Sequence, residues 1–233
     1  MNSEQIRAYL QRIGYAGSLE PTLDTLKAIQ QHQANCIPFE TFDIAMGRPI
    51  SLTFESIFNK LVKENRGGYC YELNALLYYA LLALGFKACL CHARLLKDTS
   101  SVHMIIIVEL DGLWLVDVGW GPGFTEPYLL DNIYRFKDLY EFTLDPCPLA
   151  FFEERNNYHQ TSSDSCFAKK ILCSLATCDG YLSLDGHLLT EHFAGKKTTT
   201  IISSDNEFRQ ILQNRFGLNL AINRPVWIDV PAG

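Results

Sequence analysis

The sequence lacks the marks of several large protein classes. It has no basic excess, because 20 lysines and arginines stand against 26 aspartates and glutamates for a net charge of −6; its overall field therefore does not attract nucleic acid or an anionic membrane. The longest apolar run, Ala75 to Leu84, is about half of what a transmembrane helix needs. Residues 1–17 carry scattered charges and no apolar signal-peptide core. We expect a cytoplasmic protein with a small-molecule ligand, no nucleic-acid partner and no membrane segment.

Disulfide and metal signatures are also missing. The eight cysteines include no Cys-x-x-Cys spacing, and a chain of 233 residues can bury roughly 70% of its unfolded surface without covalent staples. We therefore expect unbridged thiols, most of them buried, and no metal site. There is also no internal repeat and no low-complexity linker.

The first third of the chain has helical patterns. Residues 22–35 and 53–63 place apolar side chains at helical spacing. A third helix begins just after Gly67-Gly68 and runs to Leu84, and Gly85 is well placed to end it. Because this third helix is apolar nearly all round, we expect it at the centre of the molecule.

Strand patterns begin after Gly85 and return near the end of the chain. The pair Asp111-Gly112 lies between two apolar runs and predicts a hairpin. The sequence from Ser204 to Glu207 fits a capping box that opens a last helix, which Gly217 closes. Residues 122–165 show no clean period. The expected strands are residues 87–96, 103–110, 113–118, 169–175 and 198–202.

Cys70 is a candidate nucleophile. It lies at the start of the central helix, where unpaired N–H groups and the helix dipole favour an anion and lower the pKa of a thiol. A nucleophilic thiol also needs a base. His103 opens a strand, and Asp117 is an ionisable residue inside an apolar run, which needs a partner if it is buried. The other histidines are expected at the surface or in caps: His32, His92, His159, His187 and His192.

The hairpin register decides whether His103 and Asp117 can meet. A two-residue turn at Asp111-Gly112 would point them to opposite faces of the sheet. A three-residue loop, with Gly112 in the left-handed region, places Asp117 opposite Ile105 and makes His103 its diagonal neighbour on the same face. A Cys-His-Asp set therefore requires the three-residue loop.

These residues resemble a known family. The block Arg66-Gly-Gly-Tyr-Cys-Tyr-Glu-Leu-Asn74, with Ile37-Pro-Phe-Glu40 before it and Asp117-Val-Gly-Trp-Gly121 after it, looks like the signature of the arylamine N-acetyltransferases. The resemblance implies ping-pong transfer of acetyl from acetyl-CoA, through a cysteine thioester and without a metal, to an aromatic amine or hydrazine. By position, the catalytic residues are Cys70, His103 and Asp117.

The same resemblance implies a fold of the α+β class around a cysteine-protease-like Cys-His-Asp core. Its three parts would be an N-terminal helical bundle (1–86), a reduced central antiparallel β-barrel (87–150) and a C-terminal α/β lid (151–233). A structural ion pair would join Arg66 to Glu40. Four aromatic residues would border the acceptor pocket, and three glycines would let CoA approach the backbone. The aromatic residues are Phe39, Tyr69, Trp120 and Phe124, and the glycines are Gly119, Gly121 and Gly123.

Departures from the family pattern leave other functions open. The chain is short between Phe124 and Tyr140, Trp120 replaces the usual Phe, and Leu73 replaces the usual Gln. One alternative is an amide synthase of the same fold, which takes a carrier-protein or longer acyl thioester. A second is a Cys-His-Asp hydrolase of the papain or transglutaminase type, and a third is a catalytically inactive binding domain.

Overall fold

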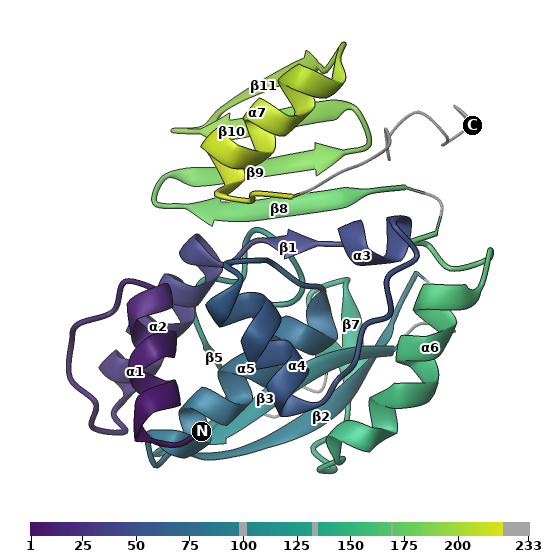
Figure 1. The fold of residues 1–233 in the computed structure, drawn as a ribbon. Helices are drawn as coiled ribbons and strands as arrows, with labels where there is room; N and C mark the ends of the chain where they lie inside the picture. The colour runs from purple at the N-terminus through teal and green to yellow at the C-terminus, as the bar shows by residue number, and fades with distance from the viewer. Residues whose placement is uncertain (98–101, 132–134, 169, 221–233) are drawn as a thin grey trace.

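The structure is a computed structural model that describes residues 1–97, 102–131, 135–168 and 170–220. It has a mixed α/β fold with two antiparallel sheets (Figure 1). None of the helices in these ranges is both long enough and apolar enough to cross a membrane. The helices and helical turns are α1 (Ser3–Arg12), α2 (Leu23–Cys36), α3 (Phe42–Ala45), α4 (Phe54–Phe58), the π-helical η1 (Asn59–Lys63), α5 (Cys70–Ala83), the 3-10 turn η2 (Leu149–Phe152), α6 (Glu153–Thr161) and α7 (Asp205–Phe216).

The three expected helices of the first third are confirmed. Residues 53–63 form α4 followed directly by η1, so the second half of this segment is wider than an α-helix. Helix α5 is the central one, with nearly every residue from Cys70 to Leu77 buried. It ends where Gly85 N–H and Phe86 N–H donate to the carbonyls of Leu82 and Leu81. Gly85 has a φ of 87°, which favours glycine at this C-terminal cap.

The central sheet has the strand order β5-β4-β3-β2-β7-β6 and is curled into a half-barrel. Among the described residues its edge strands β5 and β6 do not pair with each other, so the expected reduced barrel is open. One face packs on α5 through Leu90, Met104 and Ile106. The other face carries Ile105 and a separate aromatic cluster. The strands are β2 (Lys87–Leu95), β3 (Val102–Glu109), β4 (Leu113–Val116), β5 (Tyr128–Leu129), β6 (Arg135–Phe136) and β7 (Tyr140–Phe142).

The β3–β4 hairpin has the three-residue loop that the His103–Asp117 pairing requires. Glu109 pairs with Leu113, and Leu110 N–H donates to Gly112 O at 2.9 Å. Gly112 has a positive φ, as expected, but its φ of 137° is far from the αL value, and Asp111 also has a positive φ, of 47°, which the sequence did not predict. The register still places Asp117, just past the end of β4, on the same sheet face as His103.

The second sheet combines one strand from the first third of the chain with four strands from its C-terminal part. Its order is β1-β8-β9-β10-β11, and Phe39 in β1 pairs with Ser174 in β8. Helix α7 covers one face through Phe208 and Leu212, and in Figure 1 this sheet lies above the N-terminal helices. The strands are β1 (Phe39–Glu40), β8 (Leu172–Thr177), β9 (Gly180–Asp185), β10 (Leu188–Phe193) and β11 (Lys196–Ile201).

The sequence patterns missed several elements: α1, α3, α6, β1, β5, β6, β7, β9 and β10. The last helix is confirmed, with Ser204 Oγ accepting from Glu207 N–H and Gly217 at its end, although the Glu207 carboxylate receives the N–H of Ser203 instead of Ser204. Lys169, in the expected strand 169–175, lies outside the described residues. The division into parts at residues 86 and 150 stays a prediction; β1, from the first part, completes the sheet of the last.

All eight cysteines are unbridged thiols, as expected, but the expectation that most are buried is wrong. Only Cys70, Cys91 and Cys173 are buried, whereas Cys166 and Cys178 are exposed. No group of three or more possible metal ligands occurs among the described residues. The two exposed thiols lie on turns, outside the hydrophobic clusters that bury Cys70, Cys91 and Cys173.

The hairpin loop yields a stability prediction. A β-branched residue with positive φ costs about 1–2 kcal/mol, so Asp111→Val should lower the free energy of unfolding by about 1 kcal/mol relative to Asp111→Gly. Urea unfolding followed by circular dichroism measures both variants. Equal stability of the two would show that residue 111 does not hold the left-handed conformation.

Candidate active site

Two glycines let the chain enter α5 at Cys70. A Cβ on Gly67 would lie 2.2 Å from the carbonyl oxygen of Pro38, and one on Gly68 would lie 2.9 Å from Glu72 Oε2. Neither space admits a larger side chain without a shift of its neighbours. The close approach places Cys70, with 6% of its surface exposed, as the first residue of the helix.

Asp117 is the most heavily hydrogen-bonded carboxylate near Cys70, and none of its surface is exposed. Its Oδ1 accepts from Asn74 Nδ2 at 2.9 Å and from Gly119 N–H at 2.8 Å. Its Oδ2 lies 2.7 Å from His103 Nε2 and accepts from Tyr140 OH at 3.1 Å. These four partners come from α5, the turn after β4, β3 and β7, so the carboxylate joins four separate parts of the chain.

His103 is buried beside this carboxylate, with 4% of its surface exposed. Since Nε2 meets Asp117, Nδ1 is the ring nitrogen left for chemistry at the cavity. The ring packs edge-on against Trp120, at a centroid distance of 5.1 Å, and lies 5.5 Å from the ring of Tyr140. These contacts hold the imidazole in one plane.

Cys70 and His103 line the same cavity, which has a volume of about 310 Å³. Its aromatic walls are Phe39, Trp120 and Phe167. The ring centroids of Phe39 and Phe167 lie 6.2 Å apart. The other lining residues are Leu95, Val102, Gly119, Gly121, Pro122, His159, Cys166, Leu172, Cys173, Ser174, Ser183 and Leu184.

The structure brings together only part of the predicted pocket. Phe39 and Trp120 line the cavity, whereas Tyr69 and Phe124 do not. Tyr69 points into the core, where its hydroxyl donates to Asn156, and Phe124 packs on Phe136 in the cluster beneath the sheet. Both rings are buried behind the wall instead of forming it.

The three predicted glycines also separate. Gly119 and Gly121 line the cavity and Gly123 does not. A Cβ on Gly119 would lie 2.7 Å from the Cα of Cys70 and 2.8 Å from Asn74 Nδ2. Gly119 is therefore required by the close packing of this turn on α5, which is a different reason from an approach to CoA.

Two of the residues near Cys70 and Asp117, Tyr140 and His159, come from the segment without a clean period, and two more, Cys166 and Phe167, follow it directly. His159, Cys166 and Phe167 line the cavity, and Tyr140 contacts Asp117. The expectation of a surface or capping role for His159 is wrong, because it is buried in α6 with Nδ1 3.3 Å from Ser165 Oγ. No apolar spacing in the sequence predicts that these residues lie near Cys70 or Asp117.

The predicted lowering of the Cys70 pKa is wrong for this structure. Burial raises the pKa of the thiol, and the negative charge of Asp117 raises it further. Hydrogen bonds from the backbone N–H groups of Tyr71 and Met104 lower it, but they do not outweigh burial. The thiol therefore needs a base at the moment of reaction, and the helix terminus alone does not supply a thiolate.

The expected ion pair of Arg66 and Glu40 is present. Arg66 Nη2 lies 2.6 Å from Glu40 Oε1 and 3.0 Å from Asp43 Oδ1. Glu40 Oε2 in turn accepts from Phe42 N–H at 2.8 Å. The pair fixes the loop before Cys70 and does not reach the cavity.

Comparison with known proteins gives consistent matches. A family model described as N-acetyltransferase matches residues 22–133 and 130–225. Arylamine N-acetyltransferase 1 of Homo sapiens is 33% identical over 273 positions, which cover 92% of this chain and 94% of the relative. Since that alignment is longer than this chain, the relative carries segments that are missing here. The two matches of the family model meet at residues 130–133, within the stretch between Phe124 and Tyr140.

Solved structures agree with the sequence relatives. The arylamine N-acetyltransferase of M. tuberculosis has a TM-score of 0.84 at 29% identity and covers 92% of this chain and 93% of its own. The Mycobacterium marinum arylamine N-acetyltransferase in complex with CoA has a TM-score of 0.84 at 27% identity, with coverages of 91% and 92%. Together with the matched signature around Cys70, these similarities show that the chain belongs to the arylamine N-acetyltransferase family.

Proposed function

We propose that this protein transfers an acetyl group from acetyl-CoA to an aromatic amine or hydrazine through a thioester on Cys70. The observation that carries the proposal is the buried hydrogen bond of 2.7 Å between His103 Nε2 and Asp117 Oδ2, beside Cys70 in one cavity. Cys70, His103 and Asp117 act as a triad of the cysteine-protease type. The proposal places this reaction in the cytoplasm, where unbridged thiols stay reduced.

In the first half-reaction, His103 is the general base. Asp117 holds the proton on Nε2, so Nδ1 accepts the proton of the Cys70 thiol. The resulting thiolate attacks the carbonyl carbon of acetyl-CoA, the carbon–sulfur bond to CoA breaks, and the His103 proton goes to the departing CoA sulfur. Because burial and Asp117 raise the pKa of the thiol, proton loss is coupled to its acceptance by His103.

In the second half-reaction, the amine nitrogen attacks the thioester carbonyl. The bond to Cys70 Sγ breaks, His103 takes the proton that the nitrogen loses, and this proton returns to the sulfur. The apolar walls of Phe39, Trp120 and Phe167 suit a flat aromatic acceptor. They also limit the access of water, which would otherwise hydrolyse the thioester.

The donor side rests on the glycine-containing turn after Asp117. Gly121, with a φ of 105°, and Gly119 border the cavity without side chains, so a thioester can approach the backbone there. A relative with the same fold was solved in complex with CoA. Gly123 is left out of this role, because it does not line the cavity.

The covalent intermediate is the first test. Acetyl-CoA alone should add one acetyl group to the protein, and an arylamine or hydrazine should discharge it, as ping-pong exchange requires. Intact-protein mass spectrometry measures both steps, and Cys70→Ala, which should remain folded, is the control that gains no mass.

The same measurement separates the alternatives. An adduct that forms only from longer acyl thioesters would favour an amide synthase, and one that water discharges as fast as the amine would favour a hydrolase. No adduct from any acyl thioester would overturn the acyltransferase proposal altogether.

The carboxylate of the triad is the second test. Asp117→Asn keeps the size of the side chain but favours the wrong imidazole tautomer, so the acetylation rate should fall at least ~10³-fold. Tyr140→Phe keeps the carboxylate and three of its four partners and should lose about tenfold or less. Stopped-flow release of CoA gives both rates. Substantial activity in a folded Asp117→Asn protein would remove Asp117 from the mechanism.

A further inference from the structure

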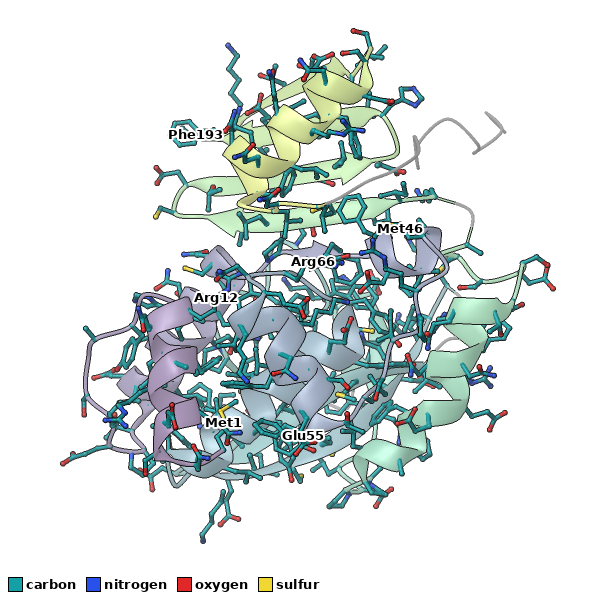
Figure 2. The ribbon with its side chains drawn as sticks, in the orientation of Figure 1. Met1, Arg12, Met46, Glu55, Arg66 and Phe193 are labelled. Atoms are coloured by element: carbon teal, nitrogen blue, oxygen red, sulfur yellow. The ribbon has the colours of Figure 1, made fainter. Side chains whose placement is uncertain are left out.

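A buried group of charges lies outside the cavity, close to the start of α5. It consists of three carboxylates and two cations, and none of them lines the cavity of Cys70. Figure 2 shows Arg66 at this place, between the N-terminal helices and the second sheet. The carboxylates belong to Glu40, Asp43 and Glu72, and the cations to Lys60 and Arg66.

Lys60 joins two of these carboxylates. Its Nζ lies 2.8 Å from Asp43 Oδ2, 2.8 Å from Glu72 Oε1 and 3.0 Å from Glu72 Oε2. Only 13% of its side chain is exposed. An ammonium taken this far out of water is stable only when carboxylates surround it, and removing it leaves those carboxylates buried and uncompensated.

Glu72 connects Lys60 to the first turn of α5. Its Oε2 accepts from the backbone N–H of Tyr69 at 3.2 Å, the residue just before Cys70. Its side chain also packs against the space that Gly68 leaves open. Burial raises the pKa of Glu72, and the charge and hydrogen bond of Lys60 oppose that rise. Lys60 thus favours the ionised carboxylate, which is the stronger acceptor for the Tyr69 N–H.

Lys60 contacts Glu72 and Asp43 from an irregular helical turn. Lys60 lies in the π-helical turn η1, while Leu61 and Val62 of the same turn are buried in the core. Lys63, the last residue of this turn, is exposed. Single π-helical turns occur frequently at functional sites, because the extra residue redirects the side chains.

We propose that Lys60 is a positioning residue for acyl transfer, which holds the Glu72 carboxylate against the Tyr69 N–H and so fixes the Cys70 sulfur toward His103. The inference rests on the proposed function of Cys70. Cys70 is the first residue of α5, and the same helix is bonded to β3 beside His103 through Asn74 Nδ2 and Met104 O, at 2.6 Å, so a small rotation of the first helical turn would change the alignment of the sulfur with β3.

The other charges near Lys60 do not replace it. Arg66 is already engaged with Glu40 and Asp43, and Arg48 reaches only Asp43, at 4.0 Å with 47% of its side chain exposed. Neither arginine has an ion pair with Glu72 in the part of the chain that the structure describes. Loss of Lys60 therefore leaves Glu72 with the Tyr69 N–H and no neighbouring cation.

The test is the single-turnover rate of thioester formation with acetyl-CoA. Lys60→Gln should slow this rate by about tenfold or more, the size expected when a charge-assisted hydrogen bond is lost. The acetyl-CoA concentration for half-maximal rate should stay unchanged, because Lys60 does not line the cavity. Lys60→Arg should recover most of the rate. Lys63→Gln, an equal loss of charge on the same turn, is the matched control and should react as the unaltered protein does.

A double variant separates positioning from general stability. If Lys60 acts through Glu72, then Lys60→Gln/Glu72→Gln should be no slower than Glu72→Gln alone. If the rate loss of the double variant equals the product of the losses caused by Lys60→Gln and Glu72→Gln separately, the inference is overturned. So would a Lys60→Gln protein that acetylates at the normal rate, or whose loss of rate only follows its folded fraction measured by circular dichroism.

Failure of the proposed function gives a different result. In that case the unaltered protein forms no thioester, and Cys70 alkylation by iodoacetamide, read by peptide mapping to separate it from the exposed Cys166 and Cys178, replaces acetylation as the readout. The inference then still requires Lys60→Gln, and not Lys63→Gln, to change the alkylation rate of Cys70. An unchanged rate would overturn it.

Discussion

The carboxylate of Asp117 has no exposure to water, and the surrounding structure supplies it with hydrogen-bond partners. An isolated buried carboxylate is very unfavourable, so it must be surrounded by donors. Here they come from Asn74 in α5, Gly119 in its own turn, His103 in β3 and Tyr140 in β7. The requirement ties the central helix and the half-barrel to one point, and Cys70 lies one helical turn before Asn74 on that helix.

Asn74 strengthens this junction through both the nitrogen and the oxygen of its side-chain amide. Its Nδ2 donates to Met104 O at 2.6 Å as well as to Asp117, and its Oδ1 accepts from Val118 N–H at 2.9 Å. One side chain of α5 therefore bonds to β3 and to the turn after β4. The distance between α5 and the strand of His103 is fixed by these bonds, and the missing Cβ of Gly119 permits it.

Patterns in the sequence predict the elements around Cys70, His103 and Asp117. Helix α5 is a long apolar run, and strands β2 to β4 are short apolar runs, two of them on either side of a turn pair, so the sequence indicates their type. The hairpin register depends on the loop length, and the three-residue loop that the structure has is the one that brings His103 and Asp117 to the same face. Helix α6 has almost no apolar side chains, and β5 and β6 have two residues each. Elements like these are stabilised by distant contacts, which a spacing pattern does not contain.

Site properties that depend on burial were harder to predict than site residues. The position of Cys70 at a helix N-terminus predicts a lowered pKa, but the sequence does not state how completely Phe39, Trp120 and Phe167 exclude water from it. The same holds for Tyr69 and Phe124, whose aromatic character fits a pocket wall or a core equally well. Their positions behind the wall follow from the packing of α6 and β6, neither of which the sequence revealed.

In the stretch between Phe124 and Tyr140, the described residues pack as an aromatic cluster on one face of the half-barrel. Phe124 and Phe136 stack on Tyr140 at centroid distances of 6.2 and 5.8 Å. Lys137 Nζ lies 5.1 Å from the ring centre of Phe136 and 5.5 Å from that of Tyr128, an arrangement that stabilises a cation over aromatic faces. Because the same rings support Tyr140, and Tyr140 bonds to Asp117, this segment is coupled to the geometry of the proposed triad.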